Sequence, residues 1–323
     1  MRAIKPFAEI MDVNNSVDIL KKIEWVGRTC YKSTENITDE SAPKFVSSLI
    51  KRGHEAMLEH ASFCFEVDYG VYCYVRSAIK RLSDEYGFNC FIRFTDEERV
   101  LMSGNVRAWR DLFHSMNQWI KIPMCFKDFI CEYPILLPEF QDDFCFNTVN
   151  HGSIRPIHAD DLKTKQEFLT HCDITVRFVI DRGISHEIVR HRPASFAQES
   201  TRYCNYAKDK FGNEITFIVP YGFEYDSSAW KMWKDSAECS EAYYFTLINM
   251  GVTPEWARAV LPNSLKTELI MTANCQEWRH FFKLRACNST GKAHPQMLEV
   301  TRPLLNDFKK TVSVIFDDLD YGE

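Results

Sequence analysis

A regular alternation of apolar and polar residues predicts one clear strand just past the middle of the chain. Residues 174–180 (ITVRFVI) place an apolar side chain at every second position, which is the period of a strand with one buried face. The Asp-Arg-Gly run at 181–183 is expected to turn the chain, and a helix is expected to start near Ser185. Pro193 cannot continue a helical ladder and restricts its predecessor, so this helix should end by about Arg192.

Helical spacing of apolar residues marks three further segments. Residues 38–60 predict a helix before Gly53, and a strand should follow at 62–68 (SFCFEVD). A hydroxyl residue followed by Pro opens a short helix at 253–261. A His-Pro pair at 294–295 opens the last helix, whose apolar stripe favours packing in a core or subunit interface over a cofactor site. The stripe consists of Leu298, Leu305, Phe308, Val312, Ile315 and Phe316.

Composition and charge narrow the class of protein. A net charge of −6 over 323 residues gives no attraction for a polyanion, so phosphate binding must come from clustered Arg, and nucleic-acid binding is disfavoured. Polar residues interrupt every apolar run near the amino terminus, which predicts no signal peptide or membrane span; we expect a cytoplasmic protein. The 12 Cys form no CxxC pair, and aromatic surroundings favour reduced core thiols at Cys64, Cys73 and Cys145.

The densest group of polar residues is RHRPASFAQESTRY, at 190–203. Arg presents a planar fork of donors that suits phosphate oxygens, and hydroxyls with loop amides complete such an anion site. A lone Arg-His-Arg triplet is more typical of a solvated basic helix end, but the residues that follow it favour a phosphate-bearing ligand. The group comprises Arg190, His191, Arg192, Ser195, Gln198, Glu199, Ser200, Thr201 and Arg202.

A second polar group lies towards the carboxyl end. It consists of Arg258, Asn274, Gln276, His280 and Arg285. Apolar residues at 278, 281 and 282 fall on one side of an expected helix, so the histidine taken alone is more typical of a packed residue than of a ligand contact. The two arginines could equally be salt-bridge partners.

The triplet at 190–192, followed by seven residues and then Ser200, resembles the signature of the flavin-dependent thymidylate synthases. Four further blocks are similar to that family in the same order. They are GHEAMLEH at 53–60, DRGISHEIVRHR at 181–192, ARAVLPNSLKTE at 257–268 and EWRHFFKLR at 277–285. The resemblance covers residues 1–68 and 174–323, which implies one catalytic domain built from these two ranges.

The resemblance also implies the residues of a site for dUMP and FAD. Catalysis would fall to Arg285, which would promote ionisation of the uracil ring at N3, and to Ser200. The residues expected to bind dUMP are Glu187, Arg190, Gln198, Glu199, Ser200, Thr201, Arg202, Arg258 and Arg285. The residues expected to bind FAD are His54, Arg190, His191, Arg192, Gln198, Asn274, Gln276 and His280. No metal is expected.

The family's fold is α/β (mixed α+β), and the resemblance implies a homotetramer whose active sites are shared between subunits. The expected activity is that of a methyltransferase: reductive methylation of dUMP to dTMP with methylenetetrahydrofolate, FAD and NADPH. The chain has no GxGxxG, so side chains rather than a Rossmann turn must hold the flavin. Gln276 stands where relatives often carry Arg, which implies a weaker flavin contact.

Residues 69–173 interrupt the two catalytic ranges. Runs such as FNCFIRF and RAWRDLFHSMNQWI are rich in aromatic residues, and a solvated linker has no core in which to bury so much apolar surface. We therefore expect a large, mostly helical inserted subdomain. A packing or interface elaboration is one interpretation of it, and regulatory or partner binding is the other.

Two alternatives to a thymidylate synthase remain at this point. A paralogue could use the same site for another change at C5 of a pyrimidine nucleotide, such as hydroxymethylation or methylation of a ribonucleotide. A non-catalytic nucleotide- or RNA-binding protein could use the Arg-rich loop, and it would show steep salt dependence and no yellow cofactor.

Overall fold

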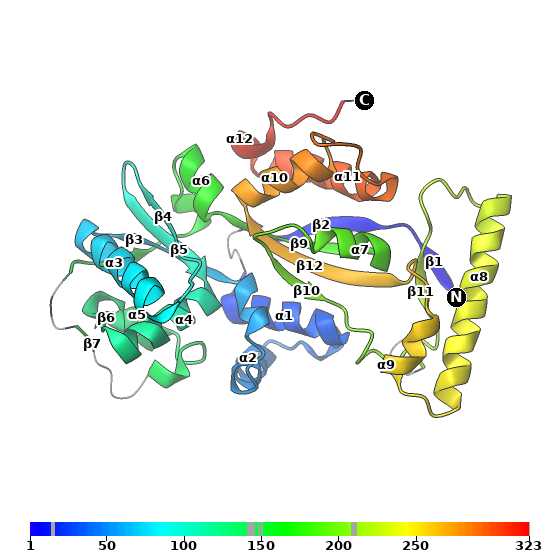
Figure 1. The fold of residues 1–323 in the computed structure, drawn as a ribbon, viewed down its shortest axis with the longest axis horizontal. Helices are drawn as coiled ribbons and strands as arrows, with labels where there is room; N and C mark the ends of the chain where they lie inside the picture. Colours follow the sequence, from blue (N-terminus) through cyan, green and yellow to red (C-terminus); the bar gives the residue numbers. More distant parts are fainter. Residues whose placement is uncertain (14–16, 141–145, 148, 150, 208–211, 323) are drawn as a thin grey trace.

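The computed structural model describes residues 1–13, 17–140, 146–147, 149, 151–207 and 212–322. Its centre is a four-stranded antiparallel sheet in the order β10-β12-β9-β2 (Figure 1). The strands are β2 (Phe7–Val13), β9 (Asp173–Asp181), β10 (Ser195–Gln198) and β12 (Lys266–Asn274). The alternating segment is thus a strand, as predicted, and the predicted mixed α/β fold class is confirmed.

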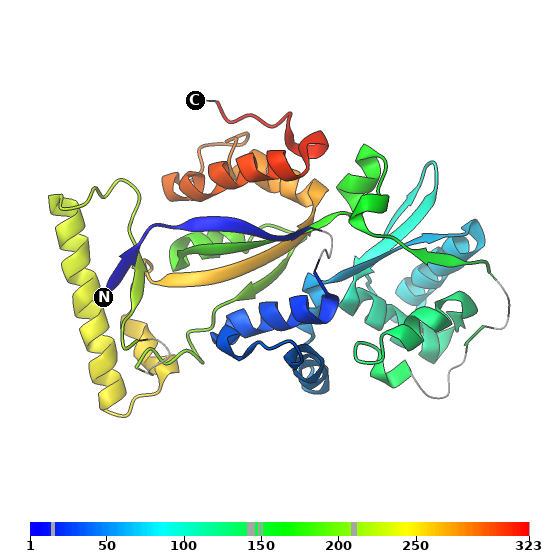
Figure 2. The same ribbon diagram turned by 180° about the vertical axis from the view of Figure 1, so that it is seen from behind.

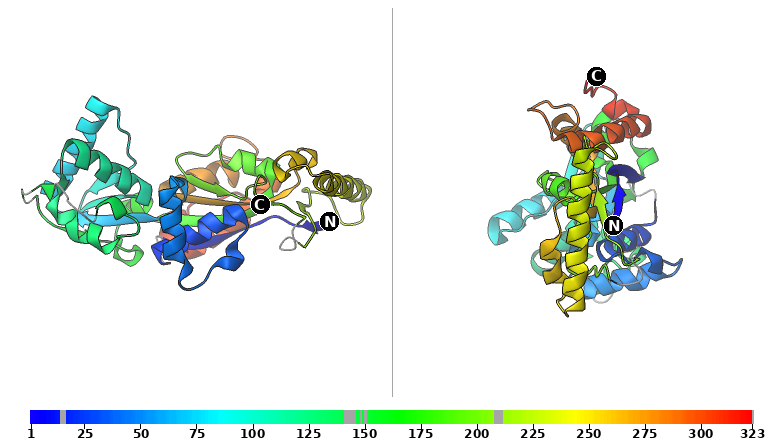
Figure 3. Two further views of the ribbon diagram at one scale, coloured as in Figure 1. Left: turned by 90° about the horizontal axis from the view of Figure 1, so that it is seen from below. Right: turned by 90° about the vertical axis from the view of Figure 1, so that its right-hand side faces the viewer.

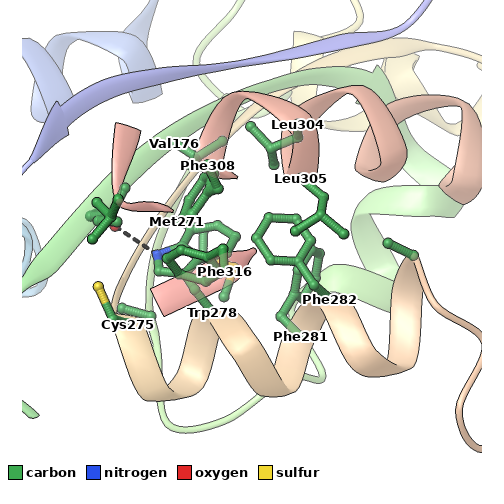
Figure 4. Packing of buried hydrophobic residues seen from close by; sticks show 14 of the residues in the cluster. Val176, Met271, Cys275, Trp278, Phe281, Phe282, Leu304, Leu305, Phe308 and Phe316 are labelled. Carbon is green, nitrogen blue, oxygen red and sulfur yellow. Dashed lines mark hydrogen bonds between the residues drawn. The ribbon is translucent and has the colours of Figure 1, made fainter. Parts of the chain in front are cut away.

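Helices cover both faces of this central sheet (Figures 1 and 2). The α10 face carries α10 (Cys275–Arg285), α11 (Pro295–Thr311) and α12 (Ser313–Phe316), and the α1 face carries α1 (Ile19–Tyr31) with α2 (Ser41–Lys51). On the α10 face, Val176 and Met271 of the sheet belong to one buried cluster with Trp278 and Phe308 (Figure 4). The predicted apolar stripe is therefore part of the core, but the single last helix that was predicted is divided at Val312 into α11 and α12.

A second antiparallel sheet, in the order β4-β5-β3-β8, lies at one end of the molecule (Figure 1). Its strands are β3 (Ser62–Val67), β4 (Arg93–Asp96), β5 (Val100–Asn105) and β8 (Ile154–Pro156). The surrounding helices are α3 (Tyr69–Tyr86), α4 (Val106–Trp119), α5 (Lys127–Glu132) and α6 (Lys165–His171). A separate short pair is formed by β6 (Ile122–Pro123) and β7 (Phe146–Asn147). Helices outweigh strands in the range 69–173, as expected.

The core of this second sheet continues across residue 68. Phe65 of β3 and Trp109 of α4 share a buried cluster with Val46 of α2. The inserted range therefore packs on the amino-terminal helices rather than standing apart from them. The division of the chain into two domains stays a prediction.

The opposite end of the molecule holds a long exposed helix (Figure 3). The elements here are β1 (Arg2–Ile4), which pairs in parallel with β11 (Thr216–Ile218), and α8 (Ser228–Asn249) and α9 (Pro254–Ala257). Short 3-10 turns complete the described chain: η1 (Thr34–Asn36), η2 (Glu55–His60), η3 (Met124–Phe126), η4 (Pro138–Phe140), η5 (Ala159–Asp161) and η7 (Arg258–Val260). None of the helices described is both long and apolar enough to cross a membrane.

The helix before the Arg-rich loop starts earlier than predicted. It is α7 (Arg182–Ile188), because the Asp181 carboxylate accepts a hydrogen bond from the Ile184 amide at 2.7 Å and caps the helix. The predicted separate turn at 181–183 is therefore wrong, although the helix does end before Pro193.

The three cysteines predicted to be buried in the core differ in their positions. Cys64 is buried, whereas Cys73 is exposed on α3, so the prediction is wrong for Cys73. Cys145 lies outside the described residues.

Candidate functional site

Arg285 lies at the end of α10, where it meets α7. Its NH1 is 3.4 Å from Oε2 of Glu187. Its Nε is buried and has no hydrogen-bond partner among the described residues. A cavity of about 270 Å³ is lined by Leu284, Arg285, Thr290, Gly291, Lys292 and Ala293. The guanidinium therefore has donor capacity left over beside an open space.

The side chain of His191 is buried close to this arginine. Its Nε2 lies 3.1 Å from the carbonyl oxygen of Glu277, and its ring centroid is 5.3 Å from that of His280. Burial lowers the pKa of His191 to about 4, and the nearby His280 and Arg285 act in the same direction. A carbonyl only accepts, so the neutral ring carries its proton on Nε2.

Arg190 and Arg192 are both exposed in the loop after α7. Neither of them forms an ion pair with a carboxylate of the described residues. Exposed guanidinium groups with unused donors fit an anionic group such as the pyrophosphate of a flavin dinucleotide. The donor set thus suits the cofactor that the resemblance implies. The described residues include no cluster of His, Cys, Asp or Glu that could hold a metal ion.

Gln198 ends β10 and points towards α7. Its Nε2 donates to Ser185 Oγ at 2.8 Å and to Thr267 Oγ1 at 3.3 Å. These bonds tie the end of the edge strand to the helix that carries Glu187 and leave the amide oxygen of Gln198 for another donor.

Glu199, the next residue, lies in a network of buried charges. Its Oε2 is 2.9 Å from Lys266 Nζ and 3.8 Å from Lys32 Nζ. The same two lysines lie 2.6 Å and 2.5 Å from Oε1 of Glu268. Burial opposes the charge of Glu268, but the two lysines outweigh it and lower its pKa to about 2. Two lysines therefore balance two carboxylates between α1, β10 and β12.

The loop after Glu199 is anchored by its own backbone. The Ser200 amide donates to the Cys30 carbonyl oxygen at 3.0 Å, and Ser200 Oγ accepts from the Arg202 amide at 3.3 Å. Arg258 donates through NH1 to Thr201 Oγ1 at 2.9 Å. The structure thus brings together four of the residues expected to bind the nucleotide, with Arg202 exposed.

The remaining residues expected at the flavin are spread apart. Asn274 caps α10: its Oδ1 accepts from the Glu277 amide at 2.9 Å, and its Nδ2 donates to the Thr170 carbonyl oxygen at 3.3 Å. Gln276 is exposed on the first turn of α10. His54 is exposed at the start of η2, which packs against α1 and β10 on the opposite face of the sheet.

A single chain therefore divides the candidate residues between two faces. Glu187, His191 and Arg285 gather on the α10 face, whereas Glu199 and His54 belong to the α1 face. The described residues of one chain do not surround one ligand with all of them.

Lys32, Lys266 and Glu268 were not among the residues predicted from the sequence. Lys266 and Glu268 alternate within the LKTE end of the block at 257–268, and this alternation would have placed them on one face of a strand. Lys32 has no such signal, because it meets Glu268 from 236 positions away in the chain.

Comparison with known proteins agrees with the motif. The model of the family described as "Thymidylate synthase complementing protein" (Thy1) matches residues 13–78 and 157–312. The chain belongs to this family. Curated relatives carry the name flavin-dependent thymidylate synthase, which confirms the resemblance seen in the sequence.

Two of these relatives illustrate the extent of the match. The Pyrococcus furiosus protein is 36% identical over 129 residues, which are 40% of this chain and 51% of that protein. The Geobacter sulfurreducens protein is 32% identical over 158 residues, 49% of this chain and 65% of that protein. The chain thus spans about half the length of the first of these relatives.

A solved structure, a UMP/dUMP methylase PolB from Streptomyces cacaoi bound with 5-Br dUMP, is 14% identical with a TM-score of 0.42, covering 98% of this chain and 96% of that chain. A likeness at this level carries no weight for function.

Proposed function

We propose that the chain is a flavin-dependent thymidylate synthase that methylates dUMP at C5 to give dTMP. The observation that carries the proposal is Arg285, which lines a cavity of about 270 Å³ and whose partly exposed guanidinium has only a 3.4 Å ion pair with Glu187 among the described residues. Carbon C5 of uracil is a weak nucleophile, so an enzyme must enrich the ring in electron density. A guanidinium fork can stabilise negative charge at N3 and its neighbouring carbonyl together, which activates C5 without a covalent bond to the protein.

The other side chains bind and orient. Glu187 restrains one end of the Arg285 guanidinium. The neutral ring of His191 adds no second positive charge beside it. Arg202 and Arg258, next to the hydroxyls of Ser200 and Thr201, would bind the nucleotide phosphate. Arg190 and Arg192 would hold the pyrophosphate of FAD.

When bound, reduced FAD would supply the hydride that completes the methyl group, with methylenetetrahydrofolate as the source of the carbon and NADPH as the reductant. We further propose a homotetramer with shared active sites. Its support is the division of the candidate residues between two faces of the sheet, which leaves each face of one chain with part of the donor set.

A visible absorption spectrum of the purified protein tests the proposal first. A yellow protein that bleaches with NADPH without oxygen, and that converts dUMP and methylenetetrahydrofolate to dTMP, is the expected result. Mass analysis of the product separates the alternatives, because a 5-hydroxymethyl product would indicate the paralogous activity. A protein that takes up neither FAD nor dUMP would refute the proposal.

A further inference from the structure

Helix α4 of the inserted range lies directly against the turn that begins after His54. The Val106 amide at the start of α4 donates to the carbonyl oxygen of Ala61 at 2.8 Å, immediately after η2. Leu58 and Ala61 belong to the same buried cluster as Trp109. The inserted range therefore forms part of the support of η2.

Two arginines of α4 reach two carboxylates of the same turn. Arg107 NH1 lies 2.7 Å from Oε1 of Glu59, and both side chains are partly exposed. Arg110, only 2% exposed, places NH2 3.4 Å from Oε1 of Glu55. Because these carboxylates are four positions apart, the two pairs fix both ends of η2.

Arg110 is itself held by a distant part of the inserted range. It donates to the carbonyl oxygen of Leu136 and to both carboxylate oxygens of Glu139. Burial opposes the charge of Glu139, but hydrogen bonds from His114 and Arg110 outweigh it and lower its pKa to about 2. Arg110 thus joins η2 to the turn at Pro138–Phe140 through a carboxylate that stays ionised at neutral pH.

We infer that the inserted range 69–173 positions the flavin-side turn at 54–60, and that Arg107 and Arg110 are its positioning residues. The inference rests on the proposed function and on the family resemblance, which implies that His54 contacts the flavin. Neither arginine touches the ligand. Each acts by restricting the backbone on which His54 and its neighbours are presented, and small displacements of such a segment are costly for binding.

The experiment compares Arg107→Met and Arg110→Met with the unaltered full chain. Hydrogen–deuterium exchange of the flavin-free protein should show amides 54–60 exchanging faster in both variants, because local opening loses an ion pair. The increase should be about tenfold for the buried Arg110 and about threefold for the exposed Arg107. The FAD dissociation constant should rise by about tenfold, while the dUMP dissociation constant stays unchanged. Arg107→Lys should restore most of both effects. Arg81→Met is the matched control, because Arg81 pairs with Glu85 inside α3 at 3.0 Å.

Wild-type exchange and wild-type FAD affinity in Arg107→Met would overturn the inference, and this exposed position decides the matter if Arg110→Met does not fold. An equal loss of affinity for FAD and dUMP would also overturn it, since that result indicates general destabilisation. If the unaltered protein binds no FAD, the proposed function fails. The exchange data would then still show whether α4 holds the turn.

Discussion

Charged residues on the two faces of the central sheet differ in how completely the chain neutralises them. On the α1 face, Glu199 and Glu268 are bonded to Lys266, and a second lysine completes the balance. On the α10 face, Arg285 has a single 3.4 Å contact with Glu187, and its Nε has no partner among the described residues. The first arrangement stabilises the backbone, whereas the second leaves charge available to a ligand. Substitutions should therefore affect stability on one face and chemistry on the other.

Lys266→Met should produce the largest effect, on stability. It leaves Glu199 with Lys32, and Glu268 with Lys32 and a 4.0 Å contact to Arg177. Breaking a buried ion pair in this way costs about 3 to 5 kcal/mol. Urea denaturation measures the change. Lys234→Met is the control, because Lys234 pairs with Glu238 on the exposed surface of α8. A loss no larger than that of the control would show that the α1 face is not held by this network.

Arg285→Lys should act on turnover instead. Lysine keeps the charge but not the planar fork, so the activation barrier should rise by about 2 to 4 kcal/mol while dUMP affinity largely persists. The free energy of unfolding should change by less than about 1 kcal/mol. Single-turnover oxidation of pre-reduced flavin with saturating dUMP and folate measures the rate. A wild-type rate would remove Arg285 from the catalytic assignment.

The pH dependence of stability should show His191 of the α10 face and Glu268 of the α1 face in different pH ranges. The native pKa of His191 is about 4, against an ordinary value of 6.5, so the unfolded chain binds the extra proton in this window. Stability therefore falls as pH drops from 6.5 to 4, by at most about 1.4 kcal/mol per pH unit from this residue. For Glu268 the pKa is lowered from 4.5 to about 2, so its contribution is lost only below that window.

His191→Gln should reduce the slope of stability against pH between pH 6.5 and 4. It should leave the part contributed by His60 and His171, whose pKa values burial lowers to about 3. Denaturant unfolding at a series of pH values measures the stability of the unaltered protein and of His191→Gln. The difference between the two curves removes the contribution of every titrating group that both proteins contain. Equal slopes would show that His191 is already protonated in the native protein.

Gln276→Arg should produce the smallest effect. It adds a cation to the exposed first turn of α10 and should tighten FAD binding by about 1 kcal/mol at a partly solvated site. Titration of the flavin-free protein gives the affinity. Equal or weaker binding would place Gln276 away from the flavin.

Local patterns predicted one strand of each sheet, β9 and β3, together with the helices α2, α10 and α11 that pack beside the central sheet. The sequences of β9, α10 and α11 each show the period of a strand or helix, so each element can be predicted without knowledge of its packing partners. β4 and β8 are only 4 and 3 residues long, too short to show a period of their own. β4 pairs with the neighbouring β5 in a hairpin, and β8 pairs with the distant β3. The start of α7 was missed because Asp181 can open a turn or cap a helix, and sequence alone does not choose between them.

The candidate site was predictable in its residue types but not in its arrangement. Arg285 and the loop at 190–202 follow from a motif, yet their distribution over two faces depends on strand order. The Lys32–Glu268 contact spans 236 positions and leaves no periodic trace in the sequence. Long-range ion pairs of this kind are therefore found only in the structure.

The pairing of β2 with β9 has a consequence for how the chain is made. Roughly 160 residues separate these neighbouring strands, so at about 5 to 20 residues per second β2 leaves the ribosome about 8 to 30 s before its partner. During that interval it is an unpaired edge, able to pair with another nascent chain. Glu9 and Asp12 place negative charges along it, which discourages such pairing. In the folded chain Glu9 pairs with Arg177 of β9, whereas Asp12 pairs with Lys22 of α1. Both acidic residues that discourage wrong pairing are therefore neutralised in the native protein.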